Sequence, residues 1–289
     1  MRDYAITTDS SCDFDQALAD SLGVTVVPLS VQIGPRRFRN APGEAMDSHS
    51  FYQLLSQGEL AQTSAPNVEE FKAVWRPILQ SGRDLLYLGF SSGLSGTYHN
   101  AAIAAEDLRE EFPEARIITV DTLCASLGQG MLVDLTVQEK RQGKTLDEAA
   151  AFAEKNRLHL CHWFTVDDLS QLRRGGRLSA GKAIVGNLLN IKPVLHVDDE
   201  GHLVPMASAK GRKKSIEALV SHMEESAVAP EQQRVYISHG DCLADAQLLA
   251  QMVRDRLHVS SVTIGDVGPV IGAHSGAGTL ALFFVGTHR

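Results

Sequence analysis

Serine, threonine and glycine are concentrated in one short stretch, SSGLSGTYHN at residues 91–100. This stretch follows an apolar run at 84–90 and precedes a helical pattern, so it lies where a strand passes into a helix. A helix N-terminus has unpaired N–H groups and the positive end of the helix dipole, which together attract anions. The glycines would let a ligand approach the backbone, and the hydroxyls would add donors. The stretch therefore predicts a site for an anionic group, or else an ordinary capped helix.

Two further turns are rich in hydroxyl groups, TTDSSCD at 7–13 and the segment QTSAPN. In the second turn, Asn67 is the expected N-cap of a helix and Glu70 occupies the capping-box position. Thr63 and Ser64 are then available for another role, since capping does not require them. None of these turns has the GxxxxGK[ST] pattern of a P-loop or the GxSxG pattern of a nucleophile elbow.

Two basic segments stand out, LRRGGRLS at 172–179 and AKGRKKS at 209–215. In the second, Arg212 and the two lysines after it fall at the N-terminus of a predicted helix. Cations at that end oppose the helix dipole and cost roughly 0.3–1 kcal/mol each at low salt. The segment is therefore a candidate contact for a phosphate or an acidic protein, and a solvated basic turn is the other interpretation.

Histidines occur in two patterns that could carry chemistry. His274 lies in a glycine-rich turn before an apolar strand, where it could contact an anion or an acidic partner, or serve only the structure. In the segment HLCH, His159 and Cys161 would share one face of a strand while His162 points to the other. Because no second cluster of ligands occurs, we expect no metal site.

Composition limits the class of protein. The chain has 289 residues with 27 basic and 35 acidic side chains, for a net charge of −8, so we expect no non-specific binding to nucleic acid. The four cysteines are scattered without CxxC spacing, which favours a reducing compartment. No run has the length of a membrane span and no apolar leader is seen, so we expect a cytoplasmic protein.

Elements alternate in two different ways along the chain. In residues 1–158, β-rich runs alternate with helical patterns, which predicts an N-terminal, Rossmann-like α/β domain with a parallel sheet. In residues 159–289 a hairpin and single helices between strands predict a mixed α/β domain. The strands are expected at 4–8, 24–33, 84–90, 115–120, 158–166, 192–197, 202–208, 233–239, 262–267 and 279–286, and the helices at 14–22, 96–111, 126–142, 145–157, 213–226 and 243–257.

Taken together, these segments resemble the DegV family of bacterial fatty-acid-binding proteins. The matching pieces span nearly the whole chain in the family's order: TTDSSCDF, VVPLSV, TSAP, SSGLSGTY, VDT, SLGQG, RRGGRLS, NLLNIKPVL, KGRKK and AHSGAG. Two departures occur, TSAPN where the family is closer to TSQPS, and Thr122-Leu123 where it often has Asp-Ser.

The resemblance implies one long-chain fatty acid bound at the interface of the two domains, with its tail in an apolar tunnel. It implies no catalysis and no cofactor in this chain. A separate fatty acid kinase subunit would phosphorylate the carboxylate, and an acyltransferase would take the product for phospholipid synthesis, with at most transient membrane contact. The implied carboxylate-binding residues are Thr63, Ser64, Ser92, Ser95, Gly96, Thr97 and His274, and the implied contacts to the head group or kinase are Arg177, Lys210 and Arg212.

Two other functions fit the same residues. One is a free-standing phosphotransferase or an acyl hydrolase that uses Ser95 or Ser92 as its nucleophile, which would need a histidine and a carboxylate nearby. The other is a regulatory adaptor whose basic turns bind an acidic partner and whose lipid is only structural. A carrier is physically reasonable, because each buried CH₂ of an acyl chain contributes about 0.8 kcal/mol to binding.

Overall fold

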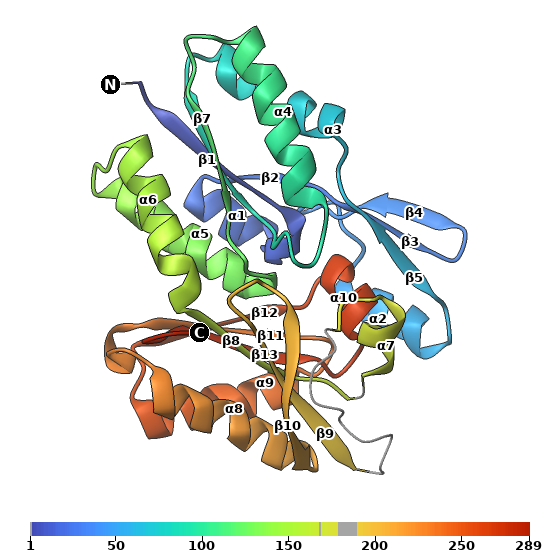
Figure 1. Cartoon of the computed structure of the whole chain (residues 1–289). Helices are drawn as coiled ribbons and strands as arrows, with labels where there is room; N and C mark the ends of the chain where they lie inside the picture. The colour runs from blue at the N-terminus through green and yellow to red at the C-terminus, as the bar shows by residue number, and fades with distance from the viewer. Residues whose placement is uncertain (1, 168, 179–189) are drawn as a thin grey trace.

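The computed structural model describes residues 2–167, 169–178 and 190–289. Figure 1 shows two layered α/β parts, one built around a four-stranded sheet and the other around a six-stranded sheet. A third, three-stranded sheet and several short helices lie beside the junction of the two parts. The mixed α/β class predicted from the sequence is confirmed.

The first sheet is parallel throughout, as the alternating pattern predicts. Its order is β2-β1-β6-β7. Helices α3 and α4 pack on one face, and α1, α5 and α6 pack on the other. The elements are β1 (Tyr4–Asp9), β2 (Thr25–Val27), β6 (Asp84–Gly89), β7 (Ile117–Asp121), α1 (Gln16–Leu22), α3 (Val68–Gln80), α4 (Thr97–Glu111), α5 (Ser126–Arg141) and α6 (Leu146–Asn156), with a 3₁₀ turn η1 (Ser10–Cys12) after β1.

Pro28 divides the run predicted as one strand at 24–33. Proline has no N–H to donate to a ladder, and the chain leaves the first sheet after β2. The second piece joins an antiparallel sheet of order β4-β3-β5, which the sequence pattern did not reveal. Its elements are β3 (Ser30–Ile33), β4 (Arg36–Arg39) and β5 (Ala61–Ser64), with helix α2 (Ser48–Ser56) between β4 and β5.

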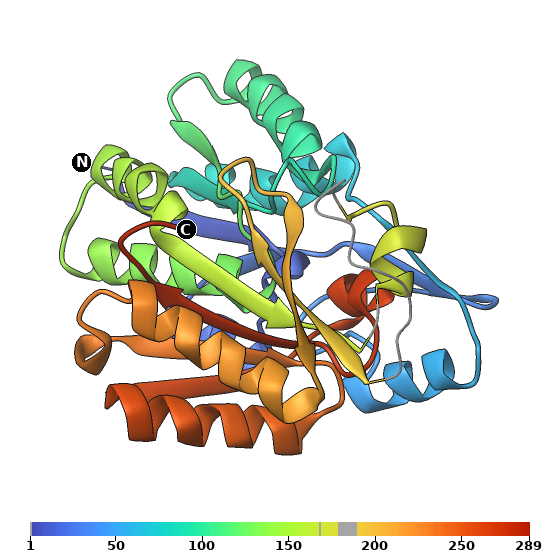
Figure 2. The same ribbon diagram turned by 60° about the horizontal axis from the view of Figure 1, so that its bottom comes forward.

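The second sheet has the order β10-β9-β8-β13-β11-β12, in which β11 and β12 run parallel and the other neighbours antiparallel. Figure 2 shows α8 and α9 side by side across one face of this sheet. Short helix α10 occupies the segment around His274 that was predicted as a glycine-rich turn, which corrects that expectation, and short helix α7 ends just before the two glycines of LRRGGRLS. The elements are β8 (Leu160–Thr165), β9 (Ile191–Val197), β10 (Leu203–Lys210), β11 (Arg234–His239), β12 (Ser261–Asp266), β13 (Leu280–Val285), α7 (Ser170–Arg174), α8 (Arg212–Ser226), α9 (Leu243–Leu257), α10 (Pro269–Ser275), η2 (Arg157–His159) and η3 (Pro230–Gln232).

Helix α5 packs against both large sheets. Eleven of its sixteen residues are buried, the pattern of a helix that is covered on all sides. Two glycines allow the close approach: a Cβ on Gly128 would lie 2.2 Å from the ring of His162, and one on Gly130 would lie 2.5 Å from the ring of Phe14. The segment SLGQG therefore fixes the spacing between the sheets.

The division of the chain after residue 158 stays a prediction. The predicted boundary falls in η2, which connects α6 to β8 of the second sheet. Within the described residues, none of the helices combines the length and the apolar character that a membrane span requires.

The side chain of Arg289 connects segments of both parts. Its guanidinium donates hydrogen bonds to the carbonyl oxygens of Leu123, Arg157, Leu160 and Asp198, at 2.6 to 3.1 Å. These carbonyls belong to the β7–α5 loop, to η2, to β8 and to the β9–β10 hairpin. The guanidinium therefore connects the β7–α5 loop and η2 to β8 and the β9–β10 hairpin of the second sheet.

We predict that Arg289→Ala lowers the free energy of unfolding by about 2 kcal/mol or more, because several partly buried carbonyl groups lose their donor. His288→Ala is the matched control, since the neighbouring side chain is exposed. Denaturant unfolding of both variants tests the prediction. Equal stability of the two variants would show that the Arg289 contacts contribute nothing.

Candidate ligand-binding site

A cavity of about 220 Å³ lies where the carboxyl ends of the first sheet's strands face the second sheet. A single buried water needs about 10–15 Å³, so this space is far larger than hydration of a few polar groups requires. Most of its lining is apolar and comes from both parts of the molecule. The apolar lining residues are Leu29, Ala65, Phe90, Leu94, Ala125, Phe164, Leu172, Val197, Leu203, Val267, Val270, Ile271, Ala281 and Phe283.

Thr63 and His274 form a polar pair in the wall of the cavity. Thr63 comes from β5 and His274 from the last turn of α10, and Thr63 Oγ1 lies 2.8 Å from His274 Nε2. Burial, with a smaller contribution from the positive charge of Arg177, lowers the pKa of His274 to about 4. The imidazole is therefore neutral at physiological pH and can act as a hydrogen-bond donor without carrying charge.

The N-terminus of α4 supplies a second polar group to the wall. Ser95 and Gly96 line the cavity, and Gly96 is the N-cap of the helix but has no side chain to cap it. Ser95 Oγ lies 2.9 Å from Thr97 Oγ1 and accepts from the Thr97 N–H at 3.3 Å. A Cβ added to Gly96 would meet nothing within 4 Å, so this glycine leaves the approach to the helix end open.

Arg177 brings a positive charge to the same cavity. Its Nε donates to the carbonyl oxygen of Leu94 at 3.2 Å, and its Nη1 donates to the carbonyl oxygen of Gly175. The guanidinium thus bridges the loop before α4 and the turn after α7. A set of neutral donors was expected around the carboxylate, and the structure adds a half-buried cation to them.

Five of the predicted site residues lie outside the lining of the cavity: Ser64, Ser92, Thr97, Lys210 and Arg212. Ser64 follows Thr63 on β5 and is exposed, because successive side chains of a strand point to opposite faces. Ser92 is exposed and its N–H donates to Asp121 Oδ1 at 3.2 Å. Thr97 is buried against Ser95, and Lys210 is exposed at the end of β10. The roles assigned to these residues remain predictions.

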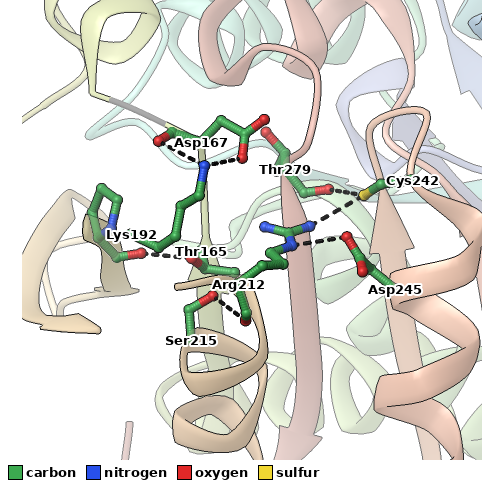
Figure 3. Close-up of polar contacts among 9 residues, drawn as sticks. Thr165, Asp167, Lys192, Arg212, Ser215, Cys242, Asp245 and Thr279 are labelled. Atoms are coloured by element: carbon green, nitrogen blue, oxygen red, sulfur yellow. Dashed lines mark hydrogen bonds and ion pairs between the residues drawn. The ribbon is translucent and has the colours of Figure 1, made fainter. Parts of the chain in front are cut away.

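Arg212 is engaged within the protein rather than free at the surface. Figure 3 shows its Nε donating to Asp245 Oδ2 at 2.8 Å and its Nη2 contacting Cys242 Sγ at 3.3 Å. The Cys242 thiol in turn donates to the carbonyl oxygen of Thr279, a residue that lines the cavity. The charge of Arg212 is therefore compensated by Asp245, and its link to the cavity is indirect.

The wall of the cavity also contains Ser126, Ser238 and His162, of which the sequence analysis named only His162, as part of HLCH and without a role at this site. Ser126 Oγ donates to Asp13 Oδ2 at 2.5 Å and lies 3.1 Å from Ser238 Oγ. His162 Nδ1 lies 2.8 Å from the Leu160 carbonyl oxygen, and burial holds the pKa of this histidine well below its usual range. These groups are neutral or internally paired, so an apolar chain can lie against them.

Asp9, in the segment TTDSSCD, positions the loop that leads into the site. Its carboxylate is fully buried and accepts from the Tyr87 hydroxyl at 2.7 Å, the Phe90 N–H at 2.9 Å and the Ser11 N–H at 3.0 Å. Burial raises the pKa of Asp9, and these hydrogen bonds oppose the shift. The position of an acidic residue directly after the first strand was the only signal in the sequence.

Metal ligands are not assembled in the described ranges 2–167, 169–178 and 190–289, where no group of three or more His, Cys, Asp or Glu side chains is placed to hold an ion. The four cysteines are unpaired thiols, as the sequence predicted. The cavity itself has a largely apolar lining with a few polar side chains, Thr63, Ser95, Arg177 and His274 among them.

We predict that His274 titrates with a midpoint near pH 4 in the ligand-free protein, measured by NMR of the imidazole ring. Histidines of the unfolded chain have a pKa of about 6.5, so the folded state binds this proton less tightly. His274 therefore favours folding above pH 6.5, and this contribution is lost as the pH falls from 6.5 to 4. Arg177→Gln should move the midpoint upward, because it removes a nearby positive charge.

Arg173→Gln is the matched control for this titration, since Arg173 is an exposed arginine four residues away. The Arg173→Gln variant should leave the titration midpoint of His274 unchanged. A midpoint near the ordinary histidine value in the wild-type protein would contradict the buried, neutral imidazole.

Comparisons with known proteins agree with this geometry. The model of the family described as "Uncharacterised protein, DegV family" matches residues 3–287. A DegV domain-containing protein of Clostridium perfringens is 42% identical over 286 residues, which cover 99% of this chain and 98% of that protein.

Solved structures superpose over the same length. A DegV family protein from Thermus thermophilus, described for its fatty acid binding, has a TM-score of 0.86 and 33% identity, covering 98% of this chain and 99% of its own. DegV from Bacillus subtilis, described as a fatty acid binding protein, has a TM-score of 0.85 and 28% identity with the same coverage. A family model and relatives that match from end to end show that this chain belongs to the DegV family.

Proposed function

We propose that this protein binds one long-chain fatty acid in the cavity and acts as a carrier. The observation that supports this most directly is a largely apolar cavity whose wall also bears Thr63, Ser95, the open N-terminus of α4, Arg177 and His274. At about 0.8 kcal/mol per buried CH₂, the tail would supply most of the affinity, offset by the cost of ordering it. The fatty acids described for related structures fit this assignment.

The carboxylate would lie between the Thr63–His274 pair and the N-terminus of α4. If the neutral imidazole carries its proton on Nε2, it donates to Thr63 Oγ1, and the threonine hydroxyl is then free to donate to the ligand. Ser95, the Gly96 N–H and Arg177 would complete the donors, and Thr97 would orient Ser95. Ser64 and Ser92 are not required in this arrangement, since both are exposed outside the cavity.

We also propose that a separate fatty acid kinase phosphorylates the bound carboxylate and that an acyltransferase consumes the acyl-phosphate. Exposed cations that could meet such a partner are Arg173 and Arg174 on α7, Lys210 at the end of β10 and Lys213 on α8. Such residues could contact an acidic partner surface. The contacts of Ser95 favour a carrier over a hydrolase, because its hydroxyl pairs with Thr97 and not with an imidazole.

We predict that Thr63→Val weakens binding of a long-chain fatty acid by about tenfold, the loss of roughly one hydrogen bond to a charged group. Binding of the corresponding methyl ester should change much less, because the ester carries no charge. Isothermal titration of delipidated protein with both ligands measures the two effects. Thr287→Val, at an exposed threonine, is the matched control.

Mass spectrometry of an organic extract of the purified protein gives an independent check of the carrier assignment. About one fatty acid per chain is expected. A protein that is empty after purification and also fails to take up labelled fatty acid is not a carrier of this kind.

We predict that Lys210→Glu slows phosphorylation of the bound fatty acid by a fatty acid kinase, while the affinity for the fatty acid itself is unchanged. The exposed lysine makes its assigned contact with the partner and not with the cavity. Lys155→Glu on α6 is the control, since it reverses an exposed charge elsewhere. Equal rates for both variants would remove Lys210 from the docking surface.

A further inference from the structure

A second, wider space of about 980 Å³ lies on the opposite side of the segment before α10. We call it the acidic cleft, lined by the start of α1, the segment 40–48 and the ends of β11 and β12. Val267 and Val270 face the fatty acid cavity, whereas Asp266 and Gly268 line the acidic cleft. The two spaces are thus separate sites that share one wall, and no part of the fatty acid assignment accounts for the second.

The lining of the acidic cleft is negative. Four carboxyl groups lie in it, those of Asp13, Asp15, Asp47 and Asp266, and within the described part of the chain no lysine or arginine lines it. Burial raises the pKa of Asp13 to about 8, and the charge of Asp266 acts in the same direction. Burial disfavours the charged form of a carboxyl group, so Asp13 is largely protonated at neutral pH and the negative charge of the lining comes from the other three carboxylates.

Two buried side chains in the same lining have acceptor atoms without a partner among the described residues. Asn40 is 6% exposed and its Oδ1 receives no hydrogen bond. The His239 side chain is 9% exposed and its Nδ1 is likewise unpaired. Buried polar atoms are rarely left in this state, because each one loses its water without compensation. Their presence at one cleft indicates a ligand that donates hydrogen bonds.

The position in the fold also favours a binding site. His239 and Asp266 are the last residues of the parallel neighbours β11 and β12 and lie opposite each other in register. Ligands of α/β proteins bind at such carboxyl ends of parallel strands. The carboxylate Oδ1 of Asp266 lies 3.5 Å from His239 Nε2, so a proton on Nε2 would face Asp266 and leave Nδ1 as an acceptor.

We propose that the acidic cleft binds a small aliphatic molecule that carries two or more protonated amines. Carboxylates, an amide oxygen and an unprotonated ring nitrogen are all acceptors, and an ammonium group is a donor with no acceptor atom. These acceptors come from the start of α1, the segment 40–48 and the ends of β11 and β12, a spread that suits a ligand whose amines are spaced along a flexible aliphatic chain. Apolar side chains in the same lining, Phe14, Met46, Leu127 and Leu243, would pack against the methylene groups between those charges.

A metal ion fits these residues less well than an amine, since within the described residues no cluster of three metal-ligating side chains is found. The cleft is also of ordinary size for a small-molecule site, which spans about 300–1,000 Å³. The proposal does not depend on the fatty acid, because none of its residues belongs to the head-group set.

Isothermal titration of the full-length protein with spermidine tests the proposal. We expect saturable binding to the wild type, weaker binding of the monoamine butylamine, and a loss of about tenfold in spermidine affinity for Asp266→Asn or Asn40→Leu. The side chain of Asp266 is 55% exposed, so the Asp266→Asn variant should fold normally, which its thermal melting checks. Asp255→Asn, at an exposed carboxylate on α9, is the matched control and should bind like the wild type.

Three results would overturn the proposal. The first is the absence of saturable spermidine binding to the wild type. The second is an equal loss of spermidine affinity in Asp255→Asn and Asp266→Asn, which would show that spermidine is attracted only by the overall negative charge of the protein. The third is unchanged affinity in both Asp266→Asn and Asn40→Leu, which would place the bound spermidine elsewhere.

Discussion

The packing of α5 between the two large sheets is the constraint on which the rest of the structure depends. Gly128 sets how closely α5 approaches the second sheet, and Gly130 sets how closely it approaches Phe14 in the segment after β1. Its N-cap Ala125 and its first residue Ser126 line the cavity. Ser126 has a positive φ of 54°, a conformation that costs about 1 kcal/mol or more for a residue with a side chain. Its hydroxyl is held between Asp13 and Ser238, which fixes this conformation at the site. The strain is thus located where two sheets, one helix and one cavity meet.

Polar groups line the cavity at two places, one beside α4 and α10 and one at the start of α5, and their chemistry differs. At the start of α5, the side chains of Ser126, Ser238 and His162 already have hydrogen-bond partners inside the protein, so they offer few free donors to a charged ligand. Near α4 and α10, the helix end at Gly96 is uncapped and Arg177 carries a full charge. A carboxylate gains more from donors that are still available than from donors already engaged. The proposed orientation of a fatty acid, with its carboxylate beside α4 and α10, rests on this difference in available donors.

Local patterns predicted most of the large elements, because hydrophobic periodicity reports which face of each element is buried. They missed β4, β5, α2, α7 and α10, which are short or glycine-rich, and β5 replaces the start of the turn predicted at QTSAPN. At the site, too, local patterns predict some features, whereas others depend on contacts between distant segments. Alternation along a strand could have excluded Ser64 once Thr63 was chosen, since neighbouring side chains face opposite ways. In contrast, the pairing of Arg212 with Asp245, or of Thr63 with His274, joins residues far apart in sequence, and nothing in the local composition reveals it.

The segment TTDSSCDF shows why a shared sequence segment is not by itself a ligand contact. Neither Asp9 nor Asp13 lines the fatty acid cavity, although the segment contributes to the resemblance that identified the family. Asp9 is surrounded by donors and holds the loop between β6 and α4, so its charge is satisfied within the protein. Asp13 has two donors, Ser126 and Gly268, lies near Asp266 and lines the acidic cleft. Two carboxyl groups four residues apart therefore have different surroundings: Asp9 is held by donors inside the first part of the molecule, whereas Asp13 joins the start of α5 to the segment before α10 at the edge of the acidic cleft.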